Sequence, residues 1–185
     1  MVNALIDRGA DVNAPSTRPE YEKATPLITA SANGRVEVMR VLLAAGARVN
    51  LGNADGVTAL MVASVHGQIE AIRVLLTAGA QINQVTAVGV TALVSASFHG
   101  KIEAIRVLLA AGAQINLVDA LGQTALMGAS AKGHVQAVEA LLAAGADPRL
   151  IASNGVTALS IAQYDKHPAI VSLLQTKLVE LAGSA

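Results

Sequence analysis

Residues 53–85 read NADGVTALMVASVHGQIEAIRVLLTAGAQINQV, and the following segment, 86–118, reads TAVGVTALVSASFHGKIEAIRVLLAAGAQINLV. The two segments are identical at about 25 of their 33 positions, far more than chance produces. A fixed period of this length is typical of a chain built from stacked structural repeats. The fold therefore depends on what one unit does and on how neighbouring units pack.

The same period runs along most of the 185 residues. A Thr-Pro-Leu or Thr-Ala-Leu tripeptide recurs every 33 residues, beginning at Thr25, Thr58, Thr91, Thr124 and Thr157. A Gly-Ala pair recurs at the same interval, at Gly46, Gly79, Gly112 and Gly145. These markers predict a single domain over 1–185, with the following parts: 1–19 (a partial repeat and a long loop), 20–52, 53–85, 86–118 and 119–151 (full repeats, units one to four), and 152–185 (a C-terminal capping repeat, unit five).

Each unit contains two helix signals separated by a glycine. In unit two, the Asp55-Gly56 pair has turn chemistry, and Thr58 has a hydroxyl that can cap a helix over 59–66. Gly67 ends this helix, and apolar residues at helical spacing predict a second helix over 69–78, which Gly79 ends. Neither helix can bury its apolar side alone, so the units must stack.

The pattern G-x-T-A-L-x-x-A-S-x-x-G-x-x-E-A-I-x-V-L-L-x-A-G-A-x-I-N resembles the ankyrin repeat over nearly the whole chain. The resemblance implies an all-α solenoid of stacked helix-turn-helix units with projecting β-turn fingers. It also implies protein binding on the concave face that the fingers and first helices form. The chain departs from the family where a histidine usually follows Thr-Pro-Leu, a position that holds Ile28, Met61, Val94, Met127 and Ser160.

Composition excludes several classes of function. Thirteen Lys and Arg balance 13 Asp and Glu, which argues against a nucleic-acid binder that works through a positive field. The chain has no cysteine, no nucleophile or phosphate-loop motif and no paired carboxylates, so we expect no enzyme activity, no metal and no cofactor. Polar residues and glycines interrupt the longest uncharged stretch, from Val74 to Gly100, so we expect no membrane insertion and a soluble cytoplasmic protein.

Three sets of polar residues follow the repeat, and we interpret them as structural. His66 and His99 are one period apart, as are His134 and His167, which places equivalent rings about 10 Å apart, too far to share a zinc ion. Glutamate and arginine should form i, i+3 pairs on the second helices: Glu37–Arg40, Glu70–Arg73 and Glu103–Arg106. The resemblance also implies that an asparagine shortly after the Gly-Ala pair ties the inter-unit loops together, and this residue is Asn13, Asn50, Asn83 and Asn116.

The two ends of the array differ. At the N-terminus, the match of Gly9-Ala10 to Gly46-Ala47 places Met1 inside a second helix and leaves that unit without a first helix. This open edge predicts either a longer array or self-association. At the C-terminus, Lys166 replaces the inter-helix glycine and Pro168 begins the last helix, as in a capping unit.

The resemblance also selects the residues that should contact a partner. They are finger residues beside the turn glycine and the two residues before the inter-helix glycine: Tyr21, Asp55, Val57, Val65, His66, Val88, Val90, Phe98, His99, Leu121, Gln123, Lys132 and Tyr164. All three aromatic residues of the chain belong to this set. Unit three contributes Val88, Val90 and Phe98 without a charge, which predicts an apolar contact patch. In the alternative interpretation, the finger valines pack on each other and Phe98 lies beneath them.

The leading hypothesis is a non-catalytic scaffold that binds a partly hydrophobic protein partner through the concave face. One alternative is a regulatory or targeting segment of a larger protein, with the chemistry elsewhere. Another is an engineered repeat protein, although the low charge and the irregular first loop do not resemble an idealised design.

Overall fold

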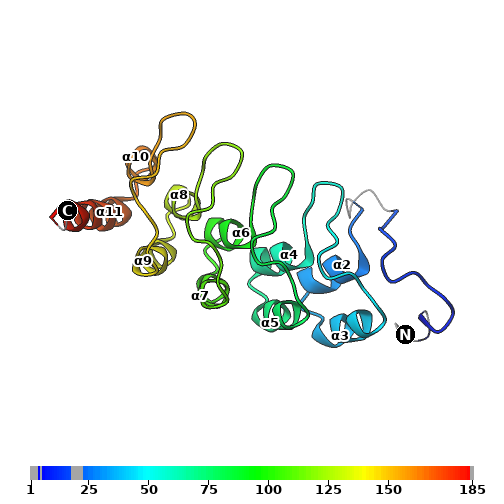
Figure 1. The fold of residues 1–185 in the computed structure, drawn as a ribbon. Coiled ribbons are helices and arrows are strands. Elements are labelled where there is room, and N and C mark those ends of the chain that lie inside the picture. The colour runs from blue at the N-terminus through cyan, green and yellow to red at the C-terminus, as the bar shows by residue number, and fades with distance from the viewer. Residues whose placement is uncertain (1–3, 5, 18–22, 184–185) are drawn as a thin grey trace.

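The computed structural model describes residues 4, 6–17 and 23–183. It consists of short helices in antiparallel pairs, which stack side by side into one row (Figure 1). The first helices of units one to five are α2 (Pro26–Ala32), α4 (Ala59–His66), α6 (Ala92–Phe98), α8 (Ala125–Ala131) and α10 (Ala158–Tyr164). The second helices are α3 (Val36–Ala44), α5 (Ile69–Thr77), α7 (Ile102–Ala110), α9 (Val135–Ala143) and α11 (Pro168–Gly183). The described residues contain no strand, and the all-α solenoid predicted from the repeat is confirmed.

The repeated threonine begins every first helix. The Oγ1 atom of Thr58 accepts a hydrogen bond from the Met61 amide at 3.4 Å, and Thr91 does the same for Val94 at 3.1 Å. In α2, Pro26 stands in the first turn, where its missing N–H costs nothing. Gly67 ends α4 with a φ of 65°, a backbone conformation that a side chain disfavours.

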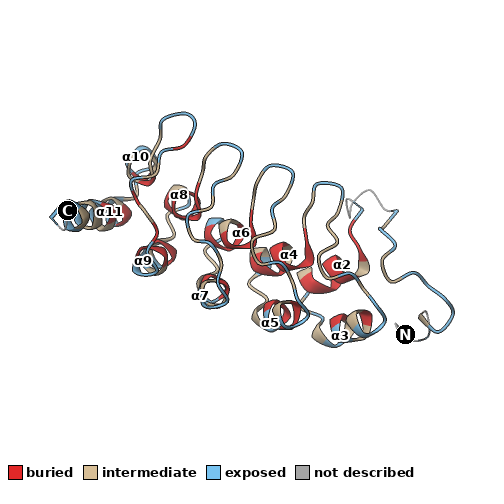
Figure 2. Cartoon of the chain, viewed as in Figure 1, coloured by how far each residue is buried: buried red, intermediate tan, exposed pale blue. Residues whose placement is uncertain are grey.

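The core is one continuous layer between the first and second helices. Figure 2 shows the buried residues on the sides of the helices that face each other. Side chains such as Leu27, Ile72, Leu108, Leu141 and Leu174 are almost completely buried. All five belong to one core cluster that runs through every unit, and burying a Leu or Ile side chain contributes about 1.5–3 kcal/mol. The stack therefore depends on contacts between neighbouring units, as repeat proteins require.

Asparagine side chains connect each unit to the next, as predicted. The Oδ1 atom of Asn50 accepts from the Gln81 amide at 2.8 Å, and its Nδ2 donates to the Gly79 carbonyl at 3.3 Å. Equivalent bonds join Asn13 to the Arg48 amide, Asn83 to Gln114 and Asn116 to Asp147. These bonds satisfy backbone groups that the loops would otherwise leave unpaired.

The ends of the described array differ as predicted. Before α2, the only described helical positions are Ala4 and Ile6, and Gly9 has a φ of 83°. At the other end, Pro168 begins the 16-residue helix α11, which covers α9 and α10. Lys166 replaces the usual glycine and keeps its left-handed conformation, with a φ of 61°. This conformation costs a non-glycine residue about 1–2 kcal/mol.

Candidate protein-binding surface

The fingers are turns that connect each second helix to the next first helix, and they project from the stack on one side (Figure 1). A backbone bond closes each one: the Asn53 amide donates to Val57 O at 3.0 Å. From unit two onward, one further backbone bond joins each finger to the next, for example from the Ala120 amide to Val88 O at 2.9 Å. The fingers therefore form a connected ridge, which fixes the positions of the side chains at their tips.

Most of the predicted contact residues are accessible on this ridge or at the ends of the first helices. Tyr21 lies outside the described residues. The exposed members are Asp55, His66, Val88, Phe98, His99, Leu121, Lys132 and Tyr164. The half-buried members are Val57, Val65, Val90 and Gln123. Val88 and Leu121 occupy equivalent finger tips of units three and four, and about 60% of each side chain is exposed.

Phe98 is the centre of a small cluster at the end of α6. The residue is 41% exposed, and the Lys132 ammonium lies 4.5 Å from the ring centroid in a cation–π contact. The His99 ring lies edge-on at 5.4 Å between centroids. Beneath the ring is the backbone of Gly128 in α8, which leaves room for it. Phe98 is thus held in place from both sides while much of its ring faces solvent, unlike the alternative in which it is covered.

The family model described as "Ankyrin repeats (3 copies)" matches residues 1–86 and again 93–181. The chain belongs to the ankyrin repeat family. None of the curated protein sequences matches the chain significantly. Ankyrin repeats are generally protein–protein interaction modules and typically non-enzymatic scaffolds.

Sequence reasoning missed one set of exposed residues on the ankyrin fingers. Val85, Val118 and Ile151 are spaced by the 33-residue period, and 47%, 49% and 65% of their side chains are exposed. Each directly precedes the residue whose amide donates the backbone hydrogen bond that closes the finger. The signal was present, because a β-branched apolar residue recurs at one position in three units, but the period alone does not show which side chains are covered.

The histidines of the ankyrin units have mainly structural contacts. The Nε2 atom of His134 donates to Phe98 O at 3.1 Å, and that of His167 to Ala131 O at 3.3 Å. The Nδ1 atom of His99 lies 2.9 Å from Ser95 O in its own helix. Within the described ranges, no group of three or more His, Asp or Glu side chains could hold a metal ion, and no helix is long and apolar enough to cross a membrane.

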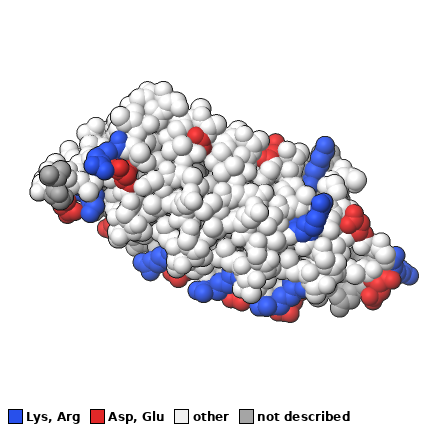
Figure 3. Space-filling view, in the orientation of Figure 1, with Lys and Arg blue, Asp and Glu red and all other residues white. Residues whose placement is uncertain are grey.

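A row of alternating positive and negative side chains, the charge ladder, lies on the second helices, on the side of the molecule opposite the fingers. Figure 3 shows positive and negative side chains alternating along the lower edge of the molecule, whereas the middle of this face has few charges. The predicted pairs Glu37–Arg40 and Glu103–Arg106 form, each at 3.8 Å. The predicted pair Glu70–Arg73 was wrong: Glu70 instead contacts Arg40 of the preceding unit at 3.4 Å, because the stack places α5 beside α3.

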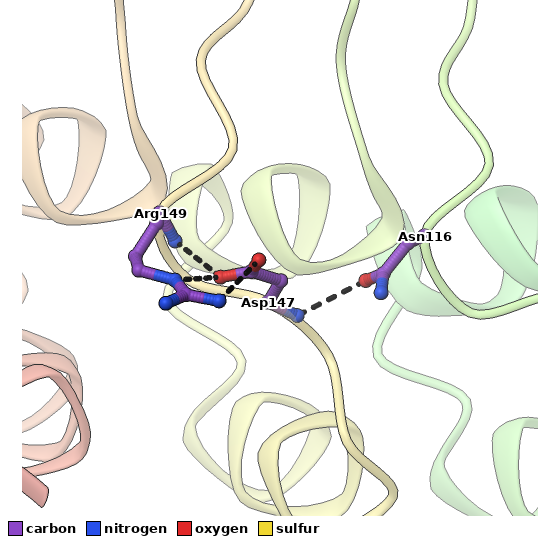
Figure 4. A network of polar contacts seen from close by, with 3 residues as sticks. All are labelled: Asn116, Asp147 and Arg149. Carbon is purple, nitrogen blue, oxygen red and sulfur yellow. Dashed lines mark hydrogen bonds and ion pairs between the residues drawn. The ribbon is translucent and has the colours of Figure 1, made fainter. Parts of the chain in front are cut away.

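A separate ion pair stabilises the loop after α9. Both guanidinium nitrogens Nε and Nη2 of Arg149 donate to the Asp147 carboxylate, at 2.9 and 3.0 Å, and the Arg149 amide donates to it at 3.0 Å (Figure 4). The Arg149 side chain, with its amide, holds the pKa of Asp147 below its usual range. Asn116 of the preceding unit holds the Asp147 amide, so this loop is fixed from two sides.

Proposed function

We propose that the chain is a non-catalytic scaffold that binds a partly hydrophobic protein partner through the fingers and first helices of units two to four. The observation that carries this proposal is the cluster around Phe98. A large aromatic side chain that is fixed by its neighbours and still exposed loses little entropy when a partner covers it.

The neighbouring finger tips support the same surface. Val88 and Leu121 are connected through the backbone bond between their fingers, and both are exposed beside the half-buried Val90. Exposed apolar side chains that lie together usually mark an interaction site. The charge ladder of the second helices, in contrast, presents mostly solvated ion pairs, which contribute little to affinity.

The test is capture of partners from a source lysate by the chain and by the double variant Val88→Glu/Phe98→Ala. Val88 is chosen over Val90 because Val90 is half-buried and its substitution could disturb folding. The control is Val179→Glu on α11, where 73% of the side chain is exposed far along the chain from the fingers. Circular dichroism should show all three proteins equally folded. We expect the chain and the control to capture a partner that the double variant does not capture. A partner that all three proteins capture would contradict the proposed face.

Three other hypotheses stay predictions. A regulatory or targeting role within a larger multidomain protein or complex would use the same surface, and the reading frame around this sequence would test it. The same reading frame would test an engineered origin. Self-association would use the N-terminal edge, where Pro26, Thr29, Ala30 and Asn33 line a groove of about 650 Å³. Light scattering across a concentration series would reveal it.

A further inference from the structure

The turns between the first and second helices form an edge with an unusual charge. Four cations lie there: Arg35, Lys101, Lys132 and Lys166. Three of the four histidines, His99, His134 and His167, lie in the same turns, His66 is the last residue of α4, and Asp165 is the single acid of the turns. With neutral histidines, four positive charges and one negative charge give this edge a net charge of +3, although the whole chain is neutral. We call these turns the helix-turn edge.

These cations are not neutralised within the described part of the chain. None of the four forms an ion pair there, whereas cations elsewhere do: Arg40 with Glu37 and Glu70, and Arg149 with Asp147. A stabilising effect on the helix ends does not account for all four cations. Arg35 and Lys101 stand at the N-terminal ends of α3 and α7, where the helix dipole disfavours a positive charge. Arg35 and Lys101, which the fold neither pairs nor favours, are therefore free to bind an external anion, and Lys132 contacts the Phe98 ring without a carboxylate partner among the described residues.

The apolar cluster lies in the middle of this edge. Phe98 and His99 directly precede the turn that holds Lys101, and Lys132 of the next unit contacts the Phe98 ring. A partner that covers the exposed part of the ring therefore meets the Lys132 ammonium, and Lys101 lies three residues further along the chain. The Lys132 ammonium takes up one face of the ring, so a flat nucleic-acid base has less of the ring to stack on, whereas a flexible apolar side chain can contact the exposed remainder. An acidic protein segment satisfies both features, because it can place an apolar side chain on Phe98 and carboxylates beside the lysines.

We propose that the helix-turn edge of units three and four binds an acidic polypeptide segment that carries a large apolar side chain, with Phe98 as its apolar contact and Lys101 and Lys132 as its carboxylate contacts. This inference rests on the proposed function, because it specifies the partner of the same surface.

The experiment is selection of a displayed library of random linear peptides against the chain. We expect the enriched peptides to combine Asp or Glu with a nearby Leu, Ile, Phe, Tyr or Trp. The double variant Lys101→Glu/Lys132→Glu should bind these peptides at least about tenfold more weakly and should itself enrich Lys and Arg. The matched control is Arg48→Glu/Arg73→Glu, which changes the net charge equally at exposed arginines off the edge and should leave affinity within about twofold.

The outcomes separate this inference from the proposed function. In one outcome, the selection enriches peptides that have no acidic preference but bind Val88→Glu/Phe98→Ala more weakly than they bind the chain. This result would overturn the acidic partner and leave the proposed surface standing. Peptides that bind this double variant as well as the chain would overturn both. Three further results would each overturn the inference. In the first, the two charge-reversed variants weaken peptide binding equally. In the second, no peptide is enriched, and in the third, a single-stranded oligonucleotide binds more tightly than the acidic peptides.

Discussion

The main-chain oxygen of Phe98 accepts a hydrogen bond from Nε2 of His134, 3.1 Å away in the next unit. The end of α6, which carries the exposed ring, is thus fixed by the beginning of α9. His134 and His167 make the same contact one period apart, as does Gln68, whose Nε2 donates to Ala32 O at 3.4 Å. The contact therefore belongs to the stack, and in unit four it also positions the candidate site.

Replacing His134 with alanine should lower the free energy of unfolding by about 1 kcal/mol, because it removes one hydrogen bond and leaves Phe98 O without its partner. Urea denaturation followed by circular dichroism measures the change. His66→Ala is the control, since His66 is exposed and forms no hydrogen bond within the described residues, and its effect should stay within about 0.5 kcal/mol. Equal effects of the two substitutions would show that the His134 contact does not stabilise the stack.

Two glycines of neighbouring units should respond to alanine in opposite directions. Gly128 lies inside α8, and a Cβ there would meet Phe98 atoms at 3.7 Å, an ordinary contact. Gly128→Ala should therefore stabilise the chain by about 0.5–1 kcal/mol through helix propensity. Gly100 has a φ of +61°, and a Cβ there would lie 2.7 Å from Nδ1 of His134. Gly100→Ala should destabilise by about 1–2 kcal/mol or more from backbone conformation alone.

The urea midpoints of the two glycine variants measure both effects. If Gly128→Ala lowers the midpoint, the Phe98 ring must need more space than the structure gives it. If Gly100→Ala leaves the midpoint unchanged, the turn between α6 and α7 must be able to move away from His134.

The helices and their boundaries were predictable because they depend on local signals. Thr58, Gly67 and Pro168 act within a few residues of the chain, and their positions follow directly from the sequence. The contacts between units were less predictable. Glu70 selects Arg40 instead of Arg73, and Lys132 lies over Phe98, because the rotation between neighbouring units decides which side chains meet.

The same limit applies to the candidate surface. The repeat shows which positions are equivalent, so Val88 and Leu121 could be selected from the sequence. It does not show how far each finger covers the next, so the exposure of Val85 was missed, and the half-burial of Val90 was predicted only in the alternative interpretation, in which the finger valines pack on each other. The asparagine contacts were predictable because they join backbone groups, whose positions repeat with the period.

Ser97 places an unpaired hydroxyl in the core, and replacing it with alanine should remove the cost of burying that group. Its hydroxyl is buried and has no hydrogen-bond partner within the described residues, whereas the equivalent Ser64 donates from Oγ to Leu60 O at 2.7 Å. Ser97→Ala should therefore leave stability unchanged or raise it by about 1 kcal/mol, because an unpaired buried hydroxyl carries a desolvation cost. Ser64→Ala should lower it by about 0.5–1 kcal/mol. Thermal unfolding of the two variants checks the difference, and an equal loss of stability in both would show that Ser97 is hydrogen-bonded in solution.

The Asp147–Arg149 pair should make stability depend on pH in the acidic range. The folded pKa of Asp147 is lowered, chiefly by the side-chain hydrogen bonds from Arg149, so the ionised form stabilises the fold. Its contribution should be complete above about pH 5, where an unfolded aspartate with a pKa of about 3.9 is also ionised, and should be lost as the pH falls through the lower folded pKa.

Urea midpoints of the chain and of Asp147→Asn, measured from pH 7 to pH 3, test this prediction. The chain should be the more stable protein at pH 7, and the difference should shrink as the solution becomes acidic, because protonation removes the charge that the variant already lacks. Asp165→Asn is the matched control, since its carboxylate forms no ion pair within the described residues, and its difference from the chain should not shrink in this way. A difference for Asp147→Asn that stays constant or grows toward pH 3 would show that Arg149 does not hold the ionised carboxylate in solution.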